Sequence, residues 1–492
     1  MSRVGRRVAI GALVTGSLIL AACADPGGDD SDADPQAGIT TVTFRLWDEA
    51  AATAYRESFD AFTAANRDVH VEVEVVPWES YWSQLEADMA AGTPADIFWT
   101  NTANVEGYAD AGLLVSMDEV LDRDAVQWQP AVVDLYTHDD QLWGVPQLWD
   151  AVALYYNADL VEEAGIDPTD LTWAPPPAPE PAPDPTVAPE ADAAAVTVPA
   201  AEPAAEPAGE PTDEPTDEPT DDAEPAAPAD TLLPAAQQLT VDTEGRTVAD
   251  EDFNPEAVAR YGFNAEPELQ SVLLPFLAQA GAEFQTGDEL GFGSPEGVAA
   301  VQYLVDLVTV HHVAPPAEVT AGVDATLEMF LDGRLALFQS GSYHLRQIAT
   351  EADFTWGIAP VVAGPTGQVS IVHGVVAAAH AGTADLTATT KVLDWIGSAD
   401  GQLALAGQGI ALPGVVDAEP AFLDHWGQAG VDVSPFLDAA AGELTPPPAG
   451  PGMQAAIDAI APVLDDAFRG DLPVPDAVDL AVARGDAALA SD

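Results

Sequence analysis

Between residues 39 and 100, short segments with alternating apolar residues and short continuous apolar runs follow one another along the chain. Strict alternation over Val69–Val76 (VHVEVEVV) predicts a strand, and the apolar runs Ile39–Trp47 and Ala95–Thr100 predict two more. Helical spacing of apolar residues separates them, over Ala51–Asn66 and Tyr81–Ala91. This strand–helix–strand–helix–strand order predicts an α/β protein with a parallel sheet covered by helices.

The pattern stays mixed farther along the chain. Leu142–Asn157 is a long extended apolar stretch, and Ala158–Gly165 has the spacing of a short helix. From residue 230 onward the pattern is mostly helical, and the last 40 residues predict two acidic amphipathic helices. Three further strands are predicted in this part, near Ala336–Gln339, Thr355–Ala359 and Val375–Ala379.

The first 38 residues have the features of a secretion signal and a tether. Arginines at the start precede an apolar run from Val8 to Ala22, which is too short to span a bilayer comfortably. The run ends in Leu-Ala-Ala-Cys, similar to a bacterial lipobox, so residues 1–22 are interpreted as a lipoprotein signal peptide and Cys23 as the lipidated residue. An ordinary cleavage site with a chance Cys is the alternative. Residues 23–38, rich in Asp and Gly, predict an acidic tether.

A second segment lacks the composition of a folded core. Residues 174–229 are rich in Pro, Glu, Asp and Ala and repeat Glu-Pro-Thr-Asp, which predicts an extended, disordered insertion. Trp173 before it and Leu232 after it indicate that its flanks belong to one folded unit. The insertion is interpreted as an expanded surface loop within a domain. The alternative is a functional role, in which the extended segment reaches through the cell wall.

Charge excludes several classes of function. The chain has 492 residues with 82 Asp and Glu against 14 Lys and Arg, a net charge of −68. Nucleic-acid binding and polybasic attachment to a membrane both need a basic face, so neither is expected. Two explanations of the acidity stay open, a surface adapted to high salt and a biased genome composition. The single Cys excludes a disulfide framework, and no motif for a metal, a P-loop or another cofactor is present.

Four segments carry a resemblance to a known family. They are VEVEVVPWESYWSQLEADMAAGTPADIFWTN at 71–101, QLWGVPQLWDAVALYYNADLVEEAGI at 141–166, MFLDGRLALFQSGSY at 329–343 and VLDWIGSADGQLALAGQGIALP at 392–413. Together they resemble the family 1 extracellular solute-binding lipoproteins of ABC importers, the maltose-binding-protein-like group. The similarity is distributed over nearly all of residues 39–490 except the insertion.

The resemblance implies a two-lobed, type II periplasmic-binding-protein-like fold. Each lobe would be a mostly parallel sheet flanked by helices, with the ligand in the cleft between the lobes. Residues 39–150 and 376–412 would form the first lobe, and 151–375 and 413–492 the second. The resemblance further implies a monomer with no enzymatic activity, which is anchored by lipid to the outer face of the cell membrane. It would pass a sugar, expected to be a di- or oligosaccharide, to ABC permease subunits.

Candidate sugar-binding residues lie where strands end. A sugar offers apolar C–H faces to aromatic rings and hydroxyls to carboxylates and amides. Trp47, Trp99, Trp149 and Tyr343 are the candidate stacking groups, with core packing as the alternative for each. Polar candidates around the rim are Asp48, Glu79, Asn101, Asp150, Ser340, Ser342, His373 and Gly374. Asp150 matches a position that often accepts sugar hydroxyls in the resembled family. Helix N-caps or solvated loops are the alternative for Asp48, Glu79 and Asn101, and a structural hinge for His373.

Rival functions remain. The same fold could bind a non-sugar solute, such as a polyamine or a glycerol phosphodiester. An anionic ligand would need Arg in the cleft, and only Arg45 lies near the predicted strand ends. A secreted glycoside hydrolase is a more remote alternative, because a chain with 82 acidic residues always offers a carboxylate pair.

Overall fold

The computed structural model describes residues 38–175, 229–320, 322 and 324–490. The predicted signal peptide, Cys23 and nearly all of the predicted tether and insertion lie outside these residues. Two compact units divide the chain, Met1–Ile39 and Thr40–Asp492, and the second carries the fold.

The described strands confirm the mixed pattern read from the sequence. They are β1 (Thr40–Leu46), β2 (Val69–Val75), β3 (Ile97–Thr100), β4 (Thr137–His138), β5 (Gln141–Leu142), β6 (Val145–Asn157), β7 (Val241–Asp242), β8 (Val258–Phe263), β9 (Gln285–Thr286), β10 (Glu289–Leu290), β11 (Leu335–Gly341), β12 (Trp356–Ala359), β13 (Val369–Ala379), β14 (Leu412–Pro413) and β15 (Glu443–Thr445).

Helices account for much of the rest of the described residues. They are α1 (Glu49–Ala65), α2 (Trp78–Ala91), α3 (Thr102–Asp110), α4 (Met117–Val120), α5 (Pro130–Leu135), α6 (Ala158–Ala164), α7 (Leu232–Leu239), α8 (Leu274–Ala280), α9 (Pro295–Thr309), α10 (Ala317–Thr320), α11 (Ala325–Leu331), α12 (Leu345–Glu351), α13 (Leu386–Ile396), α14 (Ala399–Gly407), α15 (Glu419–Ala429), α16 (Ser434–Ala441), α17 (Met453–Phe468) and α18 (Val474–Leu489).

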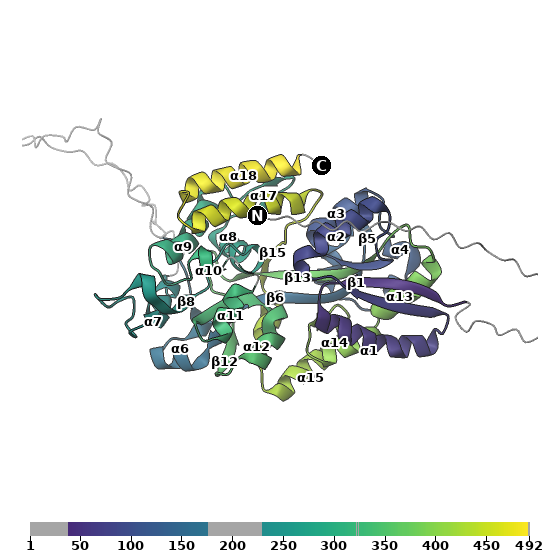
Figure 1. The fold of residues 1–492 in the computed structure, drawn as a ribbon, viewed down its shortest axis with the longest axis horizontal. Coiled ribbons are helices and arrows are strands. Elements are labelled where there is room, and N and C mark those ends of the chain that lie inside the picture. Colours follow the sequence, from purple (N-terminus) through teal and green to yellow (C-terminus); the bar gives the residue numbers. More distant parts are fainter. Residues whose placement is uncertain (1–37, 176–228, 321, 323, 491–492) are drawn as a thin grey trace, which may run out of the picture. The chain divides into compact units, whose positions relative to one another are not determined.

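One mixed sheet runs through the unit. Its strand order is β2-β1-β3-β13-β6-β11-β8-β7, with β12 and β14 paired to β6 and β15 paired to β13. At one end β2 and β3 are each parallel to β1, as the alternating strands and helices predicted. Toward the other end β8 is parallel to β11. Two long antiparallel strands, β6 and β13, join these parallel parts and run side by side in Figure 1.

Local sequence explains why the first helix forms where it does. Asp48 caps α1, because its carboxylate accepts a hydrogen bond from the backbone N–H of Ala51 at 2.7 Å. Phe59 and Phe62, three residues apart, are buried on the face toward the sheet. The helix therefore begins directly after β1 and fixes the carboxyl end of that strand.

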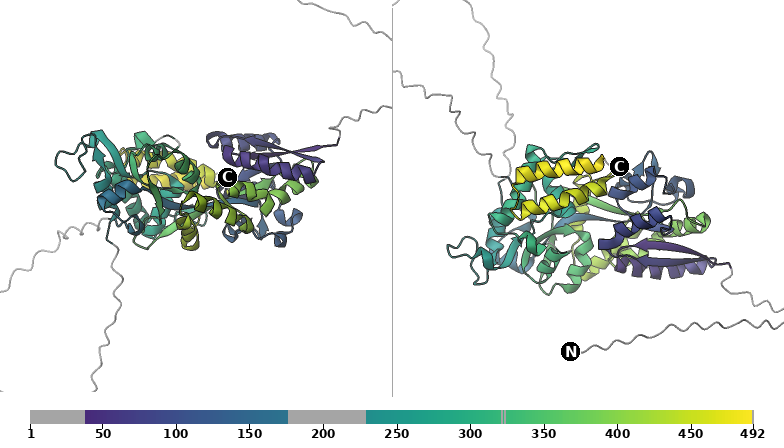
Figure 2. Two further views of the ribbon diagram at one scale, coloured as in Figure 1. Left: turned by 90° about the horizontal axis from the view of Figure 1, so that it is seen from below. Right: turned by 45° about the horizontal axis from the view of Figure 1, so that its top comes forward.

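Buried side chains form two clusters within Thr40–Asp492. One cluster includes β1, α1, α13 and α14, and the other includes α8, α9, α17 and α18. The right view of Figure 2 shows α17 and α18 side by side, and the sequence predicted two helices at this end of the chain. The helix α15 packs on α14, and its Phe422 and Trp426 are buried in the first cluster.

The flanks of the insertion lie together. The backbone N–H groups of Thr231 and Leu232 both donate to the Thr172 carbonyl at 2.8 Å. Trp173 and Leu232 are fully buried in the same cluster. The chain therefore leaves and re-enters the folded unit at one point, as the apolar flanks predicted.

Candidate functional site

The centre of the sheet places a carboxylate beside an imidazole. Asp150 on β6 and His373 on β13 occupy opposed positions of the antiparallel ladder. Their side chains meet with Asp150 Oδ1 3.1 Å from His373 Nδ1, and only 11% and 12% of these side chains are exposed. The sequence singled out both residues, and the structure brings them together.

Trp149 and Gly374 form the adjacent pair of the ladder. Gly374 is opposite Trp149 in the ladder, and its carbonyl accepts a hydrogen bond from the hydroxyl of Tyr136. A Cβ atom at residue 374 would come 3.0 Å from Val132, so the close approach of α5 favours glycine here. Trp149 is 6% exposed, and its Nε1, like Nε2 of His373, has no hydrogen-bond partner among the described atoms.

Burial and the charge of Asp150 act together on the nearest tyrosines. Burial raises the pKa of Tyr136 and of Tyr155 well above the usual value, and the negative charge of Asp150 raises both further. Tyr155 donates its hydroxyl proton to the Gly341 carbonyl at 2.9 Å. Both phenols are therefore neutral donors that hold backbone carbonyls around the carboxylate.

Aromatic rings gather at the carboxyl ends of β1 and β3. Trp47 follows β1, and its ring centroid is 5.0 Å from that of Trp99 and 5.3 Å from that of Trp78. Trp47 is half-buried, whereas Trp99 is 1% exposed, so protein atoms cover both faces of Trp99. Of the two predicted plates, Trp47 alone keeps accessible ring surface in this conformation.

Three polar candidates of this region occupy helix starts. Asp48 is exposed and caps α1, while Glu79 is exposed in the first turn of α2. Asn101 precedes α3, where its Oδ1 accepts a hydrogen bond from Asn104 Nδ2 at 2.7 Å. Asp48 therefore makes the helix-cap contact that was its alternative role. All three side chains also lie beyond the carboxyl ends of parallel strands, where ligands bind in such sheets.

The second group of predicted sugar-binding residues, Ser340, Ser342 and Tyr343, lies at the carboxyl end of β11. Ser340 and Ser342 are buried, and Ser340 Oγ lies 2.9 Å from His344 Nδ1. Tyr343, next in the chain, is 45% exposed. A tyrosine this exposed, fixed at a strand end by buried serines, offers a ring face to a ligand.

Sequence reasoning missed an acidic loop that follows β8. Glu266 accepts hydrogen bonds from Asn264 Nδ2 at 3.1 Å and from Thr326 Oγ1 at 2.8 Å. Asn264 in turn accepts from the backbone N–H of Gln339 on β11 at 2.7 Å. Because β8 and β11 are parallel, Glu266 and the Ser340 region lie at the same edge of the sheet.

The environment of Glu266 changes its protonation. Burial raises the pKa of its carboxyl to about 7, although the hydrogen bonds from Asn264 and Thr326 favour the ionised form. A carboxyl group that holds a proton near neutral pH can donate as well as accept a hydrogen bond. The strand before it was not predicted, because Arg260 and Gly262 interrupt its apolar pattern; the signal that could have found it is the acidic pair after Phe263.

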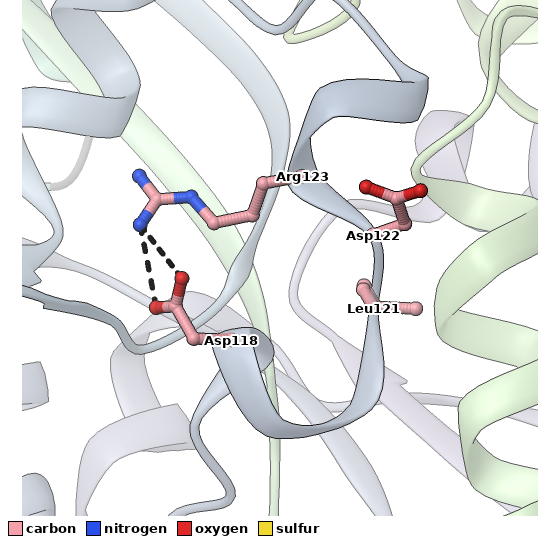
Figure 3. A pocket seen from close by; sticks show the side chains of 4 residues that line it. All are labelled: Asp118, Leu121, Asp122 and Arg123. Atoms are coloured by element: carbon pink, nitrogen blue, oxygen red, sulfur yellow. Dashed lines mark hydrogen bonds and ion pairs between the residues drawn. The ribbon is translucent and has the colours of Figure 1, made fainter.

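A surface hollow of about 520 Å³ lies elsewhere, beside α4. Figure 3 shows its four lining residues, with Arg123 Nη1 3.0 Å from Asp118 Oδ1. Asp118 Oδ2 also accepts a hydrogen bond from the backbone N–H of Leu142 at 2.8 Å. Asp118 is thus paired with Arg123 and with the backbone, and no described aromatic side chain lines this hollow, so its chemistry does not match that of the strand ends.

Two further features bear on the kind of site. Among the residues that the structure describes, His, Cys, Asp and Glu side chains form no group of three suited to holding a metal ion. Within the same residues, no helix has the length and apolarity that crossing a bilayer requires.

Comparisons with family models identify the class of protein that the chain resembles. Residues 47–254 and residues 218–427 each match a model described as bacterial extracellular solute-binding protein. A stretch of 138 residues is 28% identical to a Brucella abortus protein described as a binding protein. That match covers 28% of the chain and 34% of the relative, about a third of its length.

Solved structures extend the comparison to the whole fold. UspC of M. tuberculosis is 36% identical, with 91% of this chain and 100% of that chain covered and a TM-score of 0.67. The Listeria monocytogenes substrate-binding protein Lmo0181, in complex with cycloalternan, is 17% identical at a TM-score of 0.70, with coverage of 92% and 100%. Maltose-bound MalE3 of T. maritima is 19% identical at a TM-score of 0.65, with coverage of 90% and 98%. The two-lobed, type II periplasmic-binding-protein-like fold expected from the sequence is confirmed.

Proposed function

Because the chain belongs to the family of bacterial extracellular solute-binding proteins, as its sequence predicted, we propose that it captures a di- or oligosaccharide and delivers it to an ABC permease. One observation carries the proposal. The carboxylate of Asp150 lies on the long strand β6, between an aromatic group at the ends of β1 and β3 and an exposed tyrosine at the end of β11.

The chemistry of these groups suits a sugar. Covering about 80 Å² of apolar ring and sugar surface contributes roughly 2 kcal/mol per aromatic plate. Trp47 and Tyr343 have exposed ring surface for that purpose, and Trp149 precedes Asp150 on β6. Asp150 supplies a charge-assisted acceptor for sugar hydroxyls, and Glu266 supplies a partly buried carboxyl.

The proposed mechanism is closure of the two lobes around the ligand. A sugar that touches groups after β1 and β3 as well as groups after β11 makes both sets of contacts only when the lobes close. The extended strands β6 and β13 join the two parallel parts of the sheet, so a change at these crossovers reorients the parts. The permease would then recognise the closed form.

Anchoring and partners complete the proposal. The lipobox-like sequence ending at Cys23 supports attachment through a lipid on that residue to the outer face of the membrane. The structural neighbours bound to cycloalternan and maltose support a carbohydrate ligand. We propose a monomer that acts without catalysis and without a cofactor.

A ligand screen tests the function. The mature protein, at high and low NaCl, is subjected to thermal-shift measurements with mono-, di- and oligosaccharides, with spermidine and glycerophosphocholine as non-sugar probes. A cognate sugar at 100 times its Kd is expected to stabilise the protein by about 2.7 kcal/mol, and titration calorimetry then gives the Kd. Stabilisation by spermidine or the phosphodiester alone would favour the non-sugar alternative. Release of reducing ends from the bound sugar would support the hydrolase instead.

A further inference from the structure

His344, just after the carboxyl end of β11, joins two polar partners from different parts of the chain. Its Nδ1 lies 2.9 Å from Ser340 Oγ, and its Nε2 lies 3.3 Å from Oδ1 of Asp324, the residue before α11. Only 17% of the His344 side chain is exposed, against 51% of the Asp324 side chain. An imidazole can bridge two such groups because it has a nitrogen on each side of the ring. His344 therefore links a solvent-exposed carboxylate to a buried hydroxyl.

Two aromatic rings flank the imidazole of His344. Its ring centroid lies 5.7 Å from that of Phe338, at an interplanar angle of 28°, and 4.6 Å from that of Tyr343, at 72°. Phe338 is buried in the first cluster, so it supports the imidazole with a closely packed surface. Packing and hydrogen bonds together fix the orientation of His344, and its edge-to-face contact with Tyr343 restricts that ring as well.

The hydroxyl end of Tyr343 is held by the same group of residues. Ser340 Oγ lies 3.4 Å from the hydroxyl oxygen of Tyr343, which is a long hydrogen bond. Burial raises the pKa of this phenol well above its usual value, and the negative charges of Glu268 and Asp150 raise it further. A Cβ atom at Gly341 would overlap the ring, so the ring lies directly over this glycine. The hydroxyl is therefore enclosed, and the 45% exposure of Tyr343 comes from the rest of the residue.

These contacts form one chain, from Asp324 through His344 and Ser340 to Tyr343, which is a proposed sugar-stacking ring. A ring that is already oriented binds better, because a side chain that must first be ordered loses conformational entropy when the ligand binds. The chain restrains Tyr343 at two places, at its hydroxyl through Ser340 and at its ring through His344.

We propose that His344, oriented by Asp324, is a positioning residue of the sugar site, which holds the ring of Tyr343 in the orientation that stacks on the sugar. This inference rests on the proposed function and adds two residues to its site. The sugar contacts Tyr343, and His344 influences affinity through that ring. Loss of the His344 nitrogens therefore weakens binding even when Tyr343 itself is unchanged.

A double-mutant cycle tests the positioning role. Titration calorimetry of the mature protein uses maltotriose, cellotriose and triacetylchitotriose. His344→Phe keeps an aromatic ring beside Tyr343 but removes both nitrogens, and it is expected to lower the affinity for whichever sugar binds about tenfold. His344→Asn, whose amide can replace Nδ1 as the partner of Ser340, should restore most of the loss. In a Tyr343→Ala background, His344→Phe should change the affinity by less than about twofold.

His425→Phe is the matched control. This imidazole, on α15, also lies against the ring of the following residue, with its centroid 5.1 Å from that of Trp426, and its Nδ1 lies 3.1 Å from the Gly407 carbonyl oxygen. Its replacement should leave the sugar affinity within about twofold of the wild type, because it contacts no residue of the proposed site. Equal melting temperatures of the wild type and His344→Phe in the absence of sugar show that the comparison is between folded proteins.

The outcomes separate this inference from the proposed function. If the wild type binds one of these sugars but His344→Phe leaves its affinity unchanged, or lowers it equally with and without the Tyr343 ring, the positioning role is wrong and the sugar-binding function stands. If the wild type binds none of them and is stabilised only by spermidine or glycerophosphocholine, both are wrong.

Discussion

Asp150 and His373 face each other across two antiparallel strands that lie more than 200 residues apart in sequence. The 3.1 Å contact between Oδ1 and Nδ1 joins the two crossovers at the point where the parallel parts of the sheet meet. Because the side chains are about nine-tenths buried, the carboxylate has little water around it. A ligand that supplies hydroxyl donors would replace that missing solvation.

Replacing Asp150 is expected to weaken sugar binding. Asp150→Asn keeps the shape but removes the charge, and Asp150→Ala also removes the acceptor, so the Kd for the cognate sugar should rise at least tenfold, about 1.4 kcal/mol. Trp149→Ala should have a similar effect through lost ring contact. Titration calorimetry measures both, with Glu289→Gln, a change of an exposed carboxylate on β10, as the control. Unchanged affinities for Asp150→Ala and Trp149→Ala would refute the site.

His373 is expected to position the carboxylate. Its Nδ1 lies against Asp150 Oδ1, so a side chain that keeps a donor there should preserve the orientation of the carboxylate. His373→Gln is therefore predicted to bind the sugar within about threefold of the wild type. His373→Leu, of similar size but without a donor, should lose about tenfold. Equal affinities of the two variants would show that the contact has no influence on binding.

The acidic loop after β8 predicts a pH-dependent stability. The pKa of Glu266 is raised from its usual 4.5 to about 7 by burial, so the folded protein holds this proton more tightly than the unfolded chain. The contribution of this carboxyl group to the free energy of unfolding is therefore fully present below pH 4.5, and it is lost as the pH rises through 7. Glu266→Gln mimics the protonated form, and it should be more stable than the wild type at pH 8 by about 2 kcal/mol, after allowance for partial solvent screening.

Chemical denaturation at pH 5 and pH 8 measures this difference. The gain from Glu266→Gln should be distinctly larger at pH 8 than at pH 5, and Glu289→Gln should show no such trend. A gain of the same size at both pH values would mean that Glu266 does not titrate in this range.

The sequence predicted the secondary structure and the fold class better than the contacts between polar side chains. Alternation in Val69–Val76 and the apolar run at Ala95–Thr100 predicted β2 and β3 to within one or two residues at their ends, because strands have a distinct period. The pairing of Asp150 with His373 could not be predicted from spacing, because it depends on the register of two distant strands. Glu266 was missed because Arg260 and Gly262 hide the strand before it, and its place beside β11 depends on a pairing of distant strands.

Burial also distinguished residues that looked alike in the sequence. Trp47 and Trp99 both follow or end an apolar strand beside a polar residue, yet Trp47 keeps exposed ring surface and Trp99 does not. The difference comes from Trp47, Tyr55 and Tyr81, which pack around the end of β3. Such coverage results from several helices and is not encoded in any local pattern.

The joined flanks of the insertion predict that it can be removed. Thr172 accepts two backbone hydrogen bonds, and its own N–H donates to Thr231 Oγ1 at 2.8 Å, so the ends are held independently of what connects them. Replacing residues 176–228 with a short Gly–Ser linker should stabilise the protein by about 1–2 kcal/mol, because a shorter loop costs less closure entropy. Thermal unfolding and sugar titration check this prediction, and a large loss of either stability or affinity would assign the insertion a structural or binding role.

Salt is expected to stabilise this protein. Like charges on a surface with a net charge of −68 repel one another, and the screening length falls from about 10 Å at 0.1 M salt to about 3 Å at 1 M. The same screening weakens exposed ion pairs, such as Lys391 Nζ with Asp68 Oδ2 at 2.7 Å, but each is worth at most about 1 kcal/mol and cations are few. The repulsion should therefore outweigh the pairs, and the free energy of unfolding should rise between 0.05 and 2 M NaCl. Urea denaturation measures it, with sorbitol at equal osmolality as the control. A stability that NaCl leaves unchanged would instead favour a biased genome composition as the origin of the acidity.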